Sequence, residues 1–87
     1  MDNQSSYYFM WAKRDCPYCQ QAQQLLFEKQ ALHMSHLMDE QPQTLSKVKQ
    51  HFNWNTVPII IRQSLEGPTE FIGGYTELAN HFNKNTI

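Results

Sequence analysis

Apolar runs along the chain predict its β-strands. Residues 7–12 are rich in aromatic side chains without polar alternation, which is typical of a strand buried on both faces. Residues 57–61 are the most β-prone stretch of the chain, with Pro58 at the strand start or on an edge. Residues 69–72 follow a turn signal at 66–68 and complete a hairpin with the second run. A further short strand is expected at 33–38, because the chain has to return before its next helix.

Between these runs, apolar residues recur at the spacing of amphipathic helices. A helix is expected from about Pro17 to about Gln30, a second opens at Pro42, and a third begins near Tyr75; proline suits the first turn of the first two. The three apolar faces are Ala22, Leu25 and Leu26; Leu45, Val48 and Phe52; and Tyr75, Leu78, Ala79 and Phe82. The resulting order, β-α-β-α-β-β-α, predicts an α/β sandwich with a four-stranded mixed sheet flanked by three helices.

Length and charge limit the remaining possibilities. The 87 residues, of which 40% are hydrophobic, are expected to form a single domain over 1–87. The net charge of -1 gives no basic excess of the kind that nucleic-acid or membrane-surface binding requires. No apolar run approaches the roughly 20 residues of a membrane span, and the polar N-terminus does not resemble a signal peptide. We therefore expect a cytoplasmic protein.

The two cysteines, Cys16 and Cys19, lie where a predicted strand gives way to a predicted helix. A disulfide between them closes almost no chain, so its value lies in chemistry rather than in stability. The N–H groups and dipole of a helix N-terminus stabilise a thiolate, and Lys13 adds positive charge nearby. Cys16, at the N-terminus of the predicted helix, is the expected nucleophile. Cys19, one turn further in, is the expected resolving thiol.

Two alternatives for this pair carry less weight. A structural zinc site needs two further ligands, and the candidates are His33, His36, His51 and His81, which have no cysteine beside them. An inert buried pair is the other alternative. We expect no metal and interpret the histidines as surface or packing residues.

Two other segments are informative in combination with the cysteines. Thr56-Val57-Pro58 precedes a strand, where proline can simply protect an edge; a cis peptide bond would instead turn the Val57 backbone outward, toward an extended peptide. Gly73-Gly74 precedes Tyr75 and Thr76, whose N–H groups at a helix start form a site for a carboxylate. Taken alone, the glycine pair is more simply an ordinary strand-to-helix turn.

These segments together resemble a dithiol glutaredoxin of the small bacterial type. The matching residues are Lys13, Cys16-Pro17-Tyr18-Cys19, Thr56-Val57-Pro58 and Gly73-Gly74-Tyr75-Thr76-Glu77-Leu78. The resemblance implies a thioredoxin fold, a cis Pro58, and reduction of protein disulfides and glutathione mixed disulfides. Glutathione would be a co-substrate, with no tightly bound cofactor. The residues implied to contact it are Lys13, Tyr18, Thr56, Val57, Pro58, Gly74, Tyr75 and Thr76.

The resemblance leaves some questions open. Trp54 stands where the family often has a glutamine that holds the glycyl carboxylate of glutathione. Disulfide-containing or glutathionylated proteins, ribonucleotide reductase among them, are the implied partners, and a monomer is expected. One alternative function is carriage of an iron–sulfur cluster ligated by Cys16 and glutathione, against which Pro17 argues. Another is a dedicated electron donor reduced by thioredoxin reductase.

Overall fold

A computed structural model describes residues 6–84 and confirms the predicted order of elements. The strands are β1 (Ser6–Ala12), β2 (His33–Leu37), β3 (Ile59–Ser64) and β4 (Thr69–Gly73), and the helices are α1 (Pro17–Glu28), α2 (Pro42–Phe52) and α3 (Tyr75–Lys84). None of the helices within 6–84 is long and apolar enough to cross a membrane.

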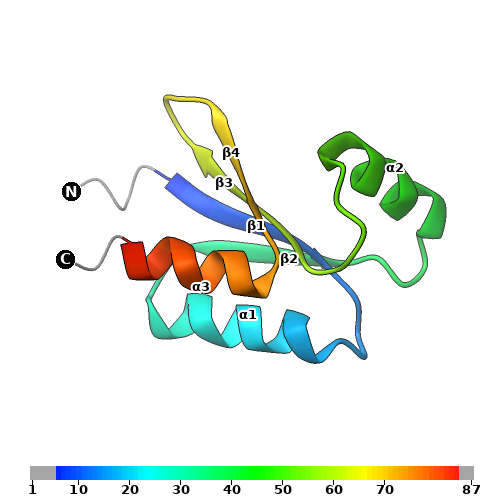
Figure 1. Ribbon diagram of the computed structural model, residues 1–87, viewed down its shortest axis with the longest axis horizontal. Helices are drawn as coiled ribbons and strands as arrows, with labels where there is room; N and C mark the ends of the chain where they lie inside the picture. Colours follow the sequence, from blue (N-terminus) through cyan, green and yellow to red (C-terminus); the bar gives the residue numbers. More distant parts are fainter. Residues whose placement is uncertain (1–5, 85–87) are drawn as a thin grey trace.

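The four strands form one mixed sheet in the order β2-β1-β3-β4. β2 runs parallel to β1, whereas β3 is antiparallel to both β1 and β4. Figure 1 shows α1 and α3 side by side on one face of the sheet, with their N-termini at the same end and α2 well apart from them. This arrangement is the α/β sandwich that the sequence pattern predicts, and it is the thioredoxin fold that the resemblance implies.

Two hydrophobic clusters hold these layers together. The larger one joins β1 to α1 and α3 and includes Met10, Ala22, Leu26 and Leu78. The smaller one, built on Met38, Leu45 and Ile59, joins the sheet to α2. Ile59 and Ile60 are fully buried and belong to different clusters, so the start of β3 is covered on both faces.

β1 departs from the prediction of a strand buried on both faces. Tyr8, Met10 and Ala12 are buried beneath α1 and α3, but the residues that alternate with them are only half-buried. The reason is the position of α2: Phe52 packs on Trp11 near the end of β1, at 5.7 Å between ring centroids. The other side chains of that face, Tyr7 and Phe9, remain partly open to solvent.

Candidate active site

The two cysteines lie at the junction of β1 and α1. Cys16 is the N-cap residue of α1, and its Sγ accepts a hydrogen bond from the Cys19 N–H at 3.1 Å. The two residues form a disulfide, with their Cα atoms 5.2 Å apart. Both residues are buried, and Cys16 at the start of the helix is slightly more exposed than Cys19, at 8% against 3%.

The first turn of α1 favours negative charge on the Cys16 sulfur in the reduced protein. It contains no acidic residue, and Pro17 occupies a position whose missing N–H costs the helix nothing. The Cys19 N–H that reaches Cys16 Sγ is one of the donors that a helix N-terminus leaves without a partner. Lys13 is exposed in the turn between β1 and α1, with no ion pair recorded for it within residues 6–84.

Val57 lies beside the disulfide. Its carbonyl oxygen is 3.9 Å from Cys16 Sγ, although the two residues are far apart in sequence. The Val57–Pro58 peptide bond is cis, as the resemblance implies. Pro58 is buried and Thr56 is exposed. The structure therefore brings this segment and the cysteines together.

The turn before α3 is more constrained than the sequence suggests. Gly73 adopts φ 122°, whereas the Gly74 N–H donates to Glu77 Oε1 at 3.0 Å and the Gly74 carbonyl accepts from the Leu78 N–H. α3 begins at Tyr75, as expected. Glu77 was not among the predicted site residues. Its position three residues after the helix cap is the signal of a capping interaction, and that signal could have identified it.

Aromatic side chains join the two helix starts. The rings of Tyr18 and Tyr75 stack at 6.4 Å between centroids and 25° between planes, and Tyr18 is 61% exposed. Trp54 lies next to this region, since a Cβ on Gly74 would be 3.8 Å from its ring. Its buried indole Nε1 has no hydrogen-bond partner within the described part of the chain. Val57 and Tyr75 thus pack against the cluster that contains both cysteines, while Tyr18 and Thr76 are exposed.

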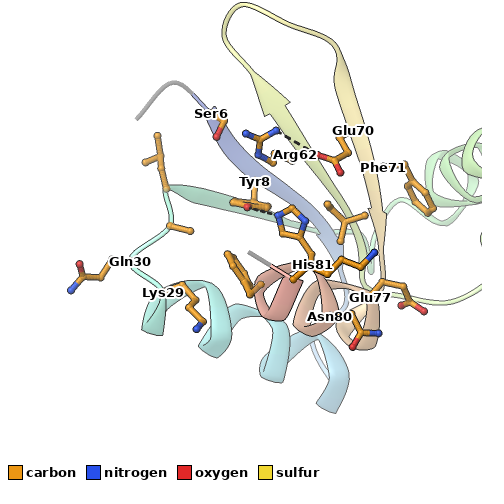
Figure 2. A pocket seen from close by; sticks show the side chains of 15 residues that line it. Ser6, Tyr8, Lys29, Gln30, Arg62, Glu70, Phe71, Glu77, Asn80 and His81 are labelled. Carbon is orange, nitrogen blue, oxygen red and sulfur yellow. Dashed lines mark hydrogen bonds and ion pairs between the residues drawn. The ribbon is translucent and has the colours of Figure 1, made fainter. Parts of the chain in front are cut away.

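Two cavities differ in their relation to the cysteines. A cavity of about 1030 Å³ lies at the start of β1, where the side chains of Tyr8, Arg62, Glu70 and His81 converge (Figure 2). It does not border either cysteine. A groove of about 420 Å³ lies along α1 and begins at Pro17, the residue after Cys16, with Tyr75 also in its lining. Neither cysteine lines this groove. Within 6–84, no group of three or more histidine, cysteine or acidic residues is arranged to hold a metal ion.

Comparisons with known proteins agree with this geometry. Its features are a helix-capping cysteine, a second cysteine one turn further in, and a neighbouring cis-proline segment. The glutaredoxin family model matches residues 7–64. A search of curated protein sequences found no match. Among solved structures, glutaredoxin 1 of Francisella tularensis is 27% identical, with a TM-score of 0.74 over 92% of this chain and 95% of that one. The dithiolic glutaredoxin 2-C-Grx1 of Trypanosoma brucei brucei is 23% identical, with a TM-score of 0.72 over 95% of this chain and 84% of that one.

Proposed function

We propose, from the premise that the chain belongs to the glutaredoxin family, that it reduces protein disulfides and glutathione mixed disulfides with electrons from glutathione. The family, the fold and the cysteine pair support thiol–disulfide oxidoreductase activity in general. The observation that carries the more specific proposal is the position of Cys16 at the N-cap of α1, with Val57 beside it.

The chemistry follows from the two sulfurs. The Cys16 thiolate attacks one sulfur of a substrate disulfide; a bond forms between them while the substrate S–S bond breaks and its second sulfur leaves as a thiolate. Cys19 then attacks the Cys16 sulfur, which releases the substrate thiol and leaves the Cys16–Cys19 disulfide seen in the structure. Two glutathione molecules supply the two electrons that reopen it and leave together as glutathione disulfide.

The residues around the cysteines support a site for the tripeptide. We propose that the Val57 backbone, beside Cys16, pairs with the extended tripeptide and that the Tyr75 and Thr76 N–H groups at the start of α3 bind a carboxylate of it. Tyr18 would cover the sulfur end. We propose the same contact role for Lys13, Thr56, Pro58 and Gly74. Gly74 can contribute only by close approach, since its N–H and carbonyl already serve the α3 cap.

The proposal extends to partners and setting. Glutathionylated or disulfide-bearing proteins of the cytoplasm would be the substrates, with ribonucleotide reductase as one candidate, and the protein would act as a monomer. Glutathione would be a co-substrate that leaves after each cycle, and no cofactor would stay bound.

Two cysteine variants test this proposal. With glutathione, glutathione reductase and NADPH present, we expect Cys19→Ser to keep reducing the mixed disulfide of glutathione and 2-mercaptoethanol but to lose most reduction of a protein disulfide. Cys16→Ser should lose both activities. If Cys19→Ser loses both with its fold intact, the division of roles is wrong. If the unsubstituted protein accepts electrons only from thioredoxin reductase, glutathione is not its co-substrate.

A further inference from the structure

Apart from Tyr75, the side chains that line the groove along α1 have no role in the cycle proposed above. One wall consists of Pro17, Gln20, Gln21, Gln24, Leu25 and Glu28 of α1, and Tyr75 of α3 closes it. The α1 residues follow one another at steps of three and one, so they form a single continuous face of the helix. This face begins at Pro17, the residue after the N-cap Cys16, so the groove starts at the same end of α1 as the reactive cysteine, although neither cysteine lines it.

The surface of this groove suits the backbone of a peptide. Leu25 and Tyr75 are half-buried, whereas the three glutamine side chains are exposed along it. A glutamine amide both donates and accepts hydrogen bonds, so it can pair with the N–H and C=O groups of an extended chain. Of the three, Gln21 makes no side-chain hydrogen bond to another residue within 6–84.

The far end of the groove carries a negative charge. Glu28 is the one charged side chain that lines it among the described residues, and Gln24 Nε2 holds its carboxylate with a hydrogen bond of 3.1 Å. Lys29 follows Glu28 in sequence, but its ammonium group contacts an aromatic ring. Lys29 Nζ lies 5.8 Å from the centre of the Phe82 ring on α3. No ion pair to Glu28 is recorded within 6–84, so its carboxylate is available to a cation from a partner.

We propose that this groove binds an extended segment of a protein substrate next to the attacked cysteine, and that Glu28 selects a lysine or arginine within that segment. The inference rests on the proposed function, since it requires Cys16 to attack a protein disulfide. A helix rises 1.5 Å per residue, so Glu28 lies about 18 Å along α1 from Cys16. An extended peptide covers about 3.3 Å per residue, which places the selected cation about five or six positions from the substrate cysteine.

Synthetic peptides with one cysteine, activated as a mixed disulfide with 5-thio-2-nitrobenzoate, test this selection. Attack by Cys16 on the peptide sulfur joins the two and releases the coloured thiolate, and in the Cys19→Ser background the joined species persists. Lysine, glutamine or glutamate is placed about five positions from the cysteine, on its N-terminal side in one series and its C-terminal side in the other.

We expect lysine peptides of one series to react about two- to five-fold faster than the glutamate peptides at low ionic strength, the range of an exposed ion pair. Half-molar salt should weaken the preference. Glu28→Gln should abolish it. Gln24→Ala should slow all the peptides of that series. Gln23→Ala is the matched control, because Gln23 lies on the same helix outside the groove.

Equal rates for lysine and glutamate peptides in both series would overturn the inference, as would a preference that survives Glu28→Gln. The small glutathione mixed disulfide, tested with Cys19 intact, should react equally well with and without Glu28→Gln. If the unsubstituted protein fails on that small substrate, the proposed function is wrong. If it succeeds there but shows no charge preference on the peptides, only the groove assignment is wrong.

Discussion

Gly73 and Gly74 are neighbours in sequence but meet different constraints in the turn before α3. Gly73 has φ 122°, and a Cβ there would lie 2.8 Å from Cγ and 2.9 Å from Cβ of Glu77. Gly74 has no such φ, and its added Cβ would come no closer than 3.4 Å to Glu77 Oε1 and 3.6 Å to the Pro58 carbonyl oxygen. The need for glycine is therefore strongest at Gly73.

We predict that Gly73→Ala lowers the free energy of unfolding by about 1–3 kcal/mol, the cost of holding a side chain in a rarely populated backbone conformation. Gly74→Ala should cost less than about 1 kcal/mol, because its Cβ makes only tight but ordinary contacts. Urea unfolding of both variants provides the measurement. Equal losses would mean that the turn relaxes around either side chain.

At the scale of a helix, Glu77 determines how α3 begins. A helix leaves its first N–H groups without internal partners. Glu77 Oε1 accepts the Gly74 N–H at 3.0 Å, which leaves the Tyr75 and Thr76 N–H groups for a ligand. Its negative charge in the first turn also interacts favourably with the helix dipole.

Glu77→Ala should therefore lower the free energy of unfolding by roughly 0.3–1.5 kcal/mol, as expected for one capping feature. Glu77→Gln keeps an oxygen acceptor for the Gly74 N–H and should lose less. Thermal or urea unfolding at pH 7 compares the two variants. If glutamine destabilises as much as alanine, the charge rather than the hydrogen bond stabilises the start of α3.

Most elements were predictable because they follow local patterns, whereas β2 was expected only because the chain has to return before α2. The residues at which the elements end were less predictable. α1 ends at Glu28 rather than Gln30, since Gln30 adopts φ 56°. This left-handed conformation is typical of glycine, so a glutamine in the sequence gives no sign of it. Asn53, by contrast, adopts φ 54° after α2, and asparagine is a residue type that often ends helices in this conformation. The partial exposure of β1 could not be foreseen, because it depends on where α2 packs.

Some features of the candidate site were predictable from local sequence, and others depend on how the whole chain folds. Cys16 at a helix start follows from local sequence, because a strand, a proline and a helical stripe surround it. The approach of Val57 to within 3.9 Å of Cys16 Sγ depends on the whole fold, and the family resemblance implied only that Val57 contacts glutathione. The stacking of Tyr18 on Tyr75 likewise requires α1 and α3 to lie together.

On the scale of the whole molecule, a set of contacts around Tyr8 joins the first strand to the last helix. Tyr8 Oη lies 3.0 Å from His81 Nε2 in the lining of the cavity of about 1030 Å³ (Figure 2). Phe82 packs on Tyr8 with 5.6 Å between ring centroids. Burial lowers the pKa of His81. Glu70 opposes this shift, whereas the positive charges of Arg62 and Lys84 add to it. Burial also raises the pKa of Tyr8, so both groups favour their neutral forms in the folded protein.

The lowered pKa of His81 makes stability depend on pH. The unfolded chain binds the His81 proton near the ordinary pKa of about 6.5, before the folded protein does. The stabilisation is thus complete above about pH 6.5 and is lost as the pH falls through the lower folded pKa. Urea unfolding between pH 7.5 and 5 should show the free energy of unfolding falling less steeply in His81→Gln than in the unsubstituted protein. Tyr8→Phe removes the hydrogen bond but keeps the burial, so it should retain the steeper fall. If Tyr8→Phe instead matches His81→Gln, the hydrogen bond to Tyr8, rather than burial, keeps His81 neutral.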